Sequence, residues 1–131
     1  MRGERWIAIG AASMALAVLA GALGAHTLQA RFVAERGAEW WEKAARYHAL
    51  HALGLIGYGL FLRGRAHTTW PGCCFVAGTL LFSGSLYALA LGAPRWCGMI
   101  TPFGGTVWIV AWIGFAVQAR GPYPHAPEGT R

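Results

Sequence analysis

The chain has 131 residues, enough for one domain, and 56% of them are hydrophobic while 12% are charged. This composition excludes an ordinary soluble domain of this size and predicts a protein whose solvent is lipid. The formal net charge of +6 does not indicate nucleic-acid binding, because the basic residues stand singly at the ends of apolar segments and form no cluster that follows phosphates.

Four uncharged stretches of 16 to 22 residues predict the fold, since a helix needs about 17–25 residues to cross the hydrocarbon core. In chain order they are Trp6–Gly24, Tyr47–Leu62, Pro71–Gly92 and Phe103–Ala119. Lipid offers the backbone no hydrogen-bond partner, so each stretch must be helical. We therefore predict an all-α integral membrane bundle of four transmembrane helices at about residues 6–25, 38–62, 71–92 and 102–120, in one domain of residues 1–120.

The first apolar stretch has two interpretations. Met1–Arg5 is basic and the small residues Ala20–Ala22 suit a cleavage site, as in a signal peptide. Its apolar run of 19 residues exceeds the roughly 7–15 of a signal peptide, so we predict that it is retained as the first helix. Small residues at its end, Gly21 and Gly24 among them, predict close packing against a neighbouring helix. A short interfacial segment at about Thr27–Gly37 leads to the second helix.

The second helix is predicted to begin before the membrane and to use Ala44–Arg46 to reach spanning length. The pairs Glu39–Lys43 and Glu42–Arg46 have the spacing and order of favourable helical ion pairs. Further along, His48 lies on a face of mostly small residues, and His51 lies about 60° away at 100° per residue. That face would fit the small end of the first helix. We expect His48 to hydrogen-bond across a helix interface with a group at the end of the first helix or the start of the fourth.

The third helix carries Ser83 and Ser85 near its middle. A hydroxyl there bonds either to its own helix backbone, which we favour, or to a neighbouring helix. The fourth helix is predicted to begin with Thr101 as the N-cap and Pro102 as the first helical residue. The pair Gly104–Gly105 then predicts another close approach between helices, with Gly104 and Gly105 in the contact.

One end of the predicted bundle gathers polar side chains, because successive helices alternate in direction. His26, His48 and His51 lie at this end, and Tyr87 lies near the end of the third helix. Three interpretations are open: hydrogen bonds between helices, which we favour; a metal or haem site on the three histidines; and proton or ion handling. No carboxylate lies at this depth to hydrogen-bond a metal-ligating histidine, so we predict no bound metal or cofactor.

Acidic residues are missing from all four stretches, which argues against a small proton-coupled exporter with a buried carboxylate. The chain also lacks a glycine-rich phosphate loop, an HExxH motif and a GxSxG motif. We therefore predict that the protein is not an enzyme. The tail of residues 121–131 is short and Pro-rich, and we predict that it is flexible.

The basic residues predict an orientation. Six of them lie on the side that holds both termini and the 63–70 loop, and five lie on the opposite side. Arg63 and Arg65 occupy the shortest loop, where positive charge has most influence on topology. We expect both termini to be cytoplasmic, in the cytoplasmic (inner) membrane of a bacterium.

Four motifs stand out in order along the chain: "GALGAH" (Gly21–His26), "YHALHALGL" (Tyr47–Leu55), "LFSGSLYALAL" (Leu81–Leu91) and "ITPFGG" (Ile100–Gly105). In this order and spacing the chain resembles the YgdD-like family of small four-helix membrane proteins, to which animal transmembrane protein 256 also looks related. The resemblance covers roughly Trp6–Ala119 and implies that the first helix is retained. It implies that the family-pattern positions are His26, Tyr47, His48, His51, Ser83, Ser85, Tyr87, Thr101 and Pro102. The family has no established activity, so the resemblance carries only the fold.

The functional prediction is a non-catalytic integral membrane protein that acts by association, either by self-assembly or as an accessory subunit of a membrane protein complex. Small-residue helix faces and the lack of a catalytic motif favour it. Its expected partners are the lipid bilayer and a protein, which is either a second copy or another subunit, and not nucleic acid. The alternatives are a histidine-based metal or haem protein and a component of a small channel or transporter.

Overall fold

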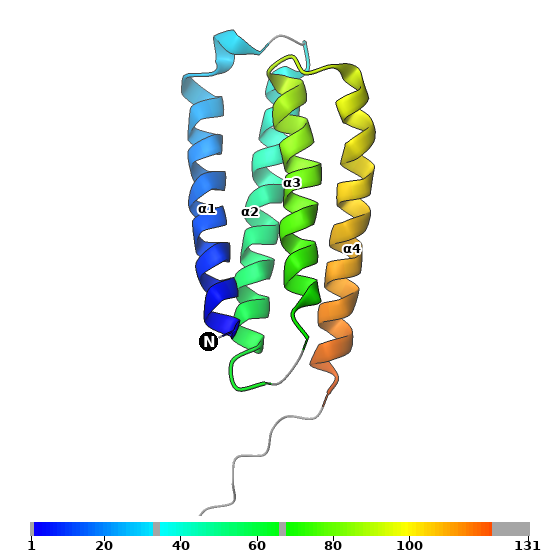
Figure 1. Cartoon of the computed structure of the whole chain (residues 1–131). Coiled ribbons are helices and arrows are strands. Elements are labelled where there is room, and N and C mark those ends of the chain that lie inside the picture. The colour runs from blue at the N-terminus through cyan, green and yellow to red at the C-terminus, as the bar shows by residue number, and fades with distance from the viewer. Residues whose placement is uncertain (1, 33–34, 66–67, 122–131) are drawn as a thin grey trace, which may run out of the picture.

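The computed structural model describes residues 2–32, 35–65 and 68–121, and these ranges contain helices and no strand. The helices run alternately up and down the bundle, so the C-terminal ends of the first and third meet the N-terminal ends of the second and fourth (Figure 1). The all-α fold class is thereby confirmed. The long helices are α1 (Arg2–His26), α2 (Gly37–Phe61), α3 (Trp70–Ala90) and α4 (Ile100–Ala119), with short 3-10 helices η1 (Gln29–Arg31) and η2 (Arg95–Met99).

Three helical segments in the described ranges are long and apolar enough to cross a membrane: Gly3–His26, Trp70–Ala90 and Arg95–Ala119. Helix α2 has the same length as α1, 25 residues, but it is not among them. The reason is that Arg46, His48 and His51 lower the mean hydropathy of the helix. The structure therefore supports three crossings by length and composition.

The helices begin and end within four residues of the predicted positions. The largest difference is at α1, which begins at Arg2 because the charged residues before Trp6 continue the helix beyond the apolar stretch. Within the expected interfacial segment, η1 covers Gln29–Arg31, while residues 33–34 lie outside the described residues. The predicted flexible tail also lies outside them, except for residue 121.

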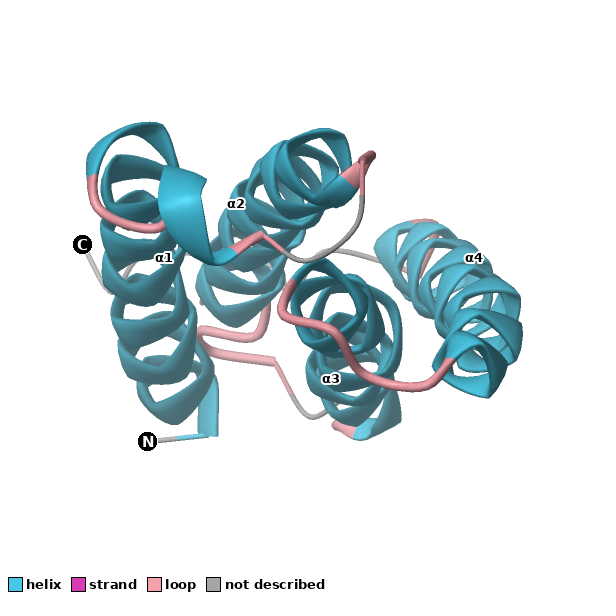
Figure 2. Cartoon of the chain, turned by 90° about the horizontal axis from the view of Figure 1, so that it is seen from above, coloured by secondary structure: helices cyan, strands magenta, loops and turns pink. Residues whose placement is uncertain are grey.

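Helix α1 packs along α2, α2 against α3, and α3 against α4, as the view from above shows (Figure 2). On α1 the buried face toward α2 consists of small residues seven positions apart, Gly3, Gly10, Ala17 and Gly24. An added Cβ on Gly10 would lie 2.7 Å from Ile56, so the two helices approach as closely as glycine permits.

The core of the bundle lies between α2, α3 and α4. Tyr58, Phe75 and Trp108 are almost fully buried there and pack with Leu55, Leu62 and Ala111. The Tyr58 hydroxyl donates to the Thr68 carbonyl at 2.6 Å, which ties α2 to the segment before α3. Large aromatic side chains thus pack α2, α3 and α4 against one another, whereas small residues pack α1 against α2.

Exposed ion pairs mark the start of α2, as the spacing predicts. Glu39 lies 3.8 Å from the Lys43 ammonium, and Glu42 lies 2.8 Å from the Arg46 guanidinium. Arg36, just before the helix, adds a second partner for Glu39 at 2.8 Å. Both predicted pairs are confirmed, and each contributes only about 0.2–0.5 kcal/mol because it is exposed.

Candidate functional site

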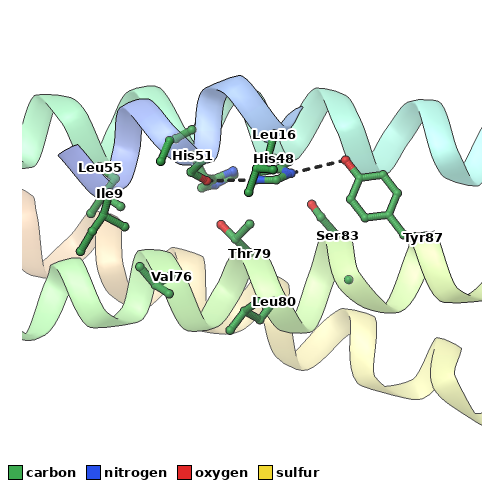
Figure 3. Close-up of a pocket in the computed structure, with 14 residues that line it drawn as sticks. Ile9, Leu16, His48, His51, Leu55, Val76, Thr79, Leu80, Ser83 and Tyr87 are labelled. Carbon is green, nitrogen blue, oxygen red and sulfur yellow. Dashed lines mark hydrogen bonds between the residues drawn. The ribbon is translucent and has the colours of Figure 1, made fainter. Parts of the chain in front are cut away.

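A groove of about 410 Å³ lies between α1 and α3, with α2 as its floor (Figure 3). Its walls are mostly apolar side chains, and its volume falls in the range of small-molecule sites. The polar side chains that line it are Ser13, His48, His51, Thr79, Ser83 and Tyr87. The groove therefore brings together four of the residues singled out in the sequence, His48, His51, Ser83 and Tyr87.

His48 is the centre of a hydrogen-bonded relay across three helices. Its Nε2 lies 2.9 Å from the Ser13 hydroxyl on α1, and its Nδ1 lies 3.4 Å from the Tyr87 hydroxyl on α3 (Figure 3). We call these three side chains the Ser13–His48–Tyr87 relay. Because both ring nitrogens face hydroxyls, the imidazole joins α2 to both walls of the groove.

The partners of His48 differ from the expected ones, which were groups at the end of the first helix or the start of the fourth. Helix α1 runs antiparallel to α2 in a register that sets Ser13, in the middle of α1, beside His48. The same register places the Trp41 indole against the Ala20 carbonyl at 2.7 Å, seven residues away on each helix. Ser13 was missed, although it is the one hydroxyl-bearing residue in the stretch Trp6–Gly24.

His51 lines the same groove but packs against α4. Its Nδ1–H donates to the Tyr47 carbonyl one turn earlier at 2.8 Å, which leaves Nε2 as the acceptor nitrogen of a neutral ring. The imidazole lies flat on the Trp108 ring, with centroids 3.5 Å apart and planes 6° apart. Tyr47 stacks beside them, its centroid 6.1 Å from that of Trp108. These contacts make His51 part of the core between α2 and α4.

The serines of α3 connect it to both neighbours. The Ser83 hydroxyl is buried and donates to the Ala44 carbonyl of α2 at 2.9 Å. The Ser85 hydroxyl lies 2.7 Å from that of Thr101 on α4 and also 2.9 Å from the Phe82 carbonyl of its own helix. Bonding within the same helix, the favoured interpretation, therefore describes part of the Ser85 contact and not that of Ser83.

The expected N-cap of α4 is corrected. Helix η2 leads directly into α4, so Met99 occupies the N-cap position and makes no side-chain cap hydrogen bond. Thr101 is already inside the helix, and its hydroxyl turns to Ser85 on α3. Pro102 is exposed in the first turn, where its missing N–H leaves no helix hydrogen bond unmade.

The four glycines predicted for close packing fall into two groups. An added Cβ on Gly24 would meet the Trp41 ring, and one on Gly104 would meet the backbone of Phe82. At Gly21 it would meet no atom within 4 Å, and at Gly105 it would lie 3.7 Å from the Phe82 ring. The close packing of α1 is also not confined to its C-terminal end, because the buried residues recur along the whole helix.

The three histidines do not form one group. His26 lies exposed at the end of α1, 13 residues beyond Ser13, which is about 20 Å along the helix. In residues 2–32, 35–65 and 68–121, no three His, Cys, Asp or Glu side chains are placed to hold a metal ion. The structure thus leaves His48 in a hydrogen-bonded relay and His51 in an aromatic stack.

The distance between the Ser13 hydroxyl and His48 Nε2 would suit a nucleophile and its base. Ser13 lies in the middle of α1, however, where the backbone N–H groups belong to the helix ladder. No such N–H is available beside Ser13 to stabilise an oxyanion. The contacts that these side chains make are hydrogen bonds between helices.

Removing the imidazole tests how much the relay contributes to stability. Hydrogen bonds between membrane helices average about 0.6 kcal/mol and reach roughly 1.7, so His48→Ala should lower the free energy of unfolding by about 1–2 kcal/mol. We expect a lower Tm by circular dichroism in mild detergent, with the helical signal retained. Leu50→Ala, at an exposed position on the same helix, should leave Tm nearly unchanged. Complete loss of helical structure in His48→Ala would contradict this modest contribution.

Comparisons with known proteins agree on one family. Residues 20–105 match a family described as a protein of unknown function, DUF423. A UPF0382 membrane protein of Staphylococcus epidermidis is 39% identical over 109 residues, which are 82% of this chain and 88% of that protein. The UPF0382 membrane protein YwdK of Bacillus subtilis is 38% identical over 117 residues, 87% of this chain and 94% of that protein. The UPF0382 inner membrane protein YgdD of Escherichia coli K12 is 36% identical over 105 residues, 78% of this chain and 79% of that protein. No solved structure is a significant match.

Proposed function

Since the chain belongs to the DUF423 family, whose curated relatives are named UPF0382 membrane proteins, we propose that it is an integral protein of the bacterial inner membrane that acts by association, without catalysis. The resemblance drawn from four motifs is confirmed by these matches. The association is either self-assembly or an accessory role in a larger membrane complex. Two structural arguments support the proposal, one for the number of crossings and one for the contact surface.

The position of α2 supports four crossings, although its hydropathy alone does not require one. Helix α2 lies along α1 on one side and α3 on the other, and it runs antiparallel to both (Figures 1 and 2). If α1 and α3 cross the bilayer, α2 crosses with them. Its polar groups are satisfied inside the bundle, His48 by the relay and His51 by Tyr47 and Trp108, which makes the crossing tolerable.

Cysteine labelling of intact cells or oriented vesicles tests the four crossings. Cysteines introduced at Arg36 and Arg95, one at a time in a chain without Cys73, Cys74 and Cys97, should both react from the same side. A cysteine at Arg63 should react from the opposite side, the cytoplasm. Labelling of the Arg36 and Arg95 positions from opposite sides would contradict four crossings.

The observation that carries the association proposal is a second small-residue face on α1. Ala8, Ala15 and Ala22 are exposed, and each precedes by two positions a small residue buried against α2. Two positions are about 200° on a helix, so these alanines lie on the side of α1 that points away from α2. Small residues in such spacing let another helix approach closely in lipid. The exposed face therefore fits a helix of a second copy or of another subunit.

Disulfide cross-linking in membranes tests this face. In the same cysteine-free background, Ala15→Cys should form a stoichiometric disulfide-linked dimer of twice the chain's mass if two copies associate through this face. The matched control is Ile109→Cys, an exposed position near the middle of α4, which should stay monomeric. A monomeric Ala15→Cys protein under the same oxidation would count against self-assembly through α1.

A further inference from the structure

The groove between α1 and α3 lies deep in the bundle. Ser13 is 11 residues from the start of α1 and 13 from its end, or about 17 Å and 20 Å along the helix. At that depth a charged ligand is disfavoured, since intramembrane charge is costly unless it is paired, and no Asp, Glu, Lys or Arg lines the groove. A ligand of this groove is therefore neutral, which excludes phospholipid headgroups and nucleotides as its recognised parts.

The groove opens sideways. Ile9, Leu16 and Leu80 on its two walls are 43%, 60% and 69% exposed, so in a membrane they face the lipid. A ligand would enter from the hydrocarbon phase and lie between apolar walls, with its inner edge on the polar floor that Figure 3 shows. These walls suit an apolar molecule that already resides in the bilayer.

The relay always leaves one O–H group without a hydrogen bond inside the relay. With a neutral imidazole, the Ser13–His48–Tyr87 relay holds three donor protons, one on each side chain, and its two hydrogen bonds use two of them. When the relay points from Ser13 to Tyr87, the Tyr87 O–H is left over, and when it points the other way, the Ser13 O–H is left over. The Ser13 hydroxyl can bond to its own helix backbone, whereas Tyr87 must find an acceptor elsewhere. The complementary ligand group is thus a hydrogen-bond acceptor that carries no charge.

A neutral, lipid-soluble molecule with an apolar body and a carbonyl acceptor matches all three properties of the groove. The groove lies deep in the membrane, opens toward the lipid and has an unused O–H donor. We therefore propose that it binds the ring of a lipid-soluble quinone, with a ring carbonyl accepting a hydrogen bond from the relay. The proposal concerns binding and includes no electron transfer. It does not rest on association, since the exposed alanines Ala8 and Ala15 do not line the groove and lie about 100° around α1 from Ile9 and Leu16.

A steric plug tests the site without disturbing the bundle. Gly84 lines the groove, and an added Cβ there meets no atom within 4 Å, so Gly84→Leu should fill the groove while the protein folds normally. Gly57→Leu is the matched control, because Gly57 also lies on a helix with no atom within 4 Å of an added Cβ, but outside this groove. Both variants replace a helical glycine by a better helix former and should melt no lower than the unchanged protein.

Binding is measured with decylubiquinone and the purified protein in phosphatidylcholine nanodiscs, by quenching of tryptophan fluorescence. Trp41 and Trp108 are suitable reporters, since their rings contact Tyr87 and His51 at centroid distances of 4.6 and 3.5 Å. We expect saturable quenching in the unchanged protein and in Gly57→Leu, with binding about tenfold or more weaker in Gly84→Leu. Decylbenzene, which has no carbonyl, should not compete.

Three results would overturn the proposal: no saturable binding to the unchanged protein, equal binding to both leucine variants, or equal competition by decylbenzene. The last would identify a hydrocarbon groove that lipid chains fill, in which the relay has no part in recognition.

Discussion

Gly104→Leu is expected to separate α3 from α4 and to lower the free energy of unfolding by about 3 kcal/mol. An added Cβ at Gly104 would collide with the backbone of Leu81 and Phe82, 2.8 Å from the Leu81 carbonyl carbon. Backbone of a neighbouring helix cannot rotate away as a side chain can, so the helices themselves must move apart. Unfolding in detergent with increasing dodecyl sulfate, followed by circular dichroism and tryptophan fluorescence, measures the effect.

The neighbouring glycine provides the matched control for this substitution. At Gly105 an added Cβ would lie 3.7 Å from the Phe82 ring, an ordinary van der Waals distance. Gly105→Leu should therefore unfold close to the unchanged protein, aided by the higher helix propensity of leucine. Equal stability of the two variants would show that close backbone contact at residue 104 does not hold α3 and α4 together.

Trp108→Ala is expected to cost about 3 kcal/mol, the low end of the range for a buried tryptophan. The ring is 3% exposed, lies flat on His51, and donates from Nε1 to the Phe75 carbonyl at 3.2 Å. Lipid gives no hydrophobic drive between helices, so the loss comes from van der Waals contact and from the freed polar group. The same denaturation series measures this loss.

Trp96→Ala is the control for the loss of an indole. Trp96 is 58% exposed in η2 at one end of the bundle, and its removal should change stability by no more than about 0.5 kcal/mol. A cost at Trp96 as large as that at Trp108 would mean that tryptophan anchors at the ends of the helices, rather than packing in the core, control stability.

Composition and apolar length predict the all-helical fold, because lipid forces each long apolar stretch into a helix. The same criterion does not select α2, because Arg46, His48 and His51 reduce its hydropathy. His48 bonds to Ser13 of α1, whereas Arg46 pairs with Glu42 and His51 bonds to Tyr47 within α2 itself. The exposed ion pairs of α2 were predictable for the opposite reason, since both partners lie on one helix at fixed spacing.

The relay could not be predicted because it depends on the register between helices. Ser13 and Tyr87 lie 35 and 39 residues from His48 in sequence, and nothing local to α2 selects them. A slip of one position along α1 would turn Ser13 about 100° away from His48. That register is set by small residues recurring every seventh position on α1, a repeat that extends beyond the small end noted in the sequence.

The order in which the helices are synthesised gives the α1–α2 contact a role in insertion. Helix α1 is made first and is apolar enough to enter the bilayer by itself, whereas α2 is the least apolar long helix of the chain. When α2 leaves the ribosome, Ser13 is already in the membrane and can receive His48 before α3 and Tyr87 exist. With the four crossings that we propose, α1 and α2 would enter the bilayer as a hairpin in which contact with α1 helps α2 to insert.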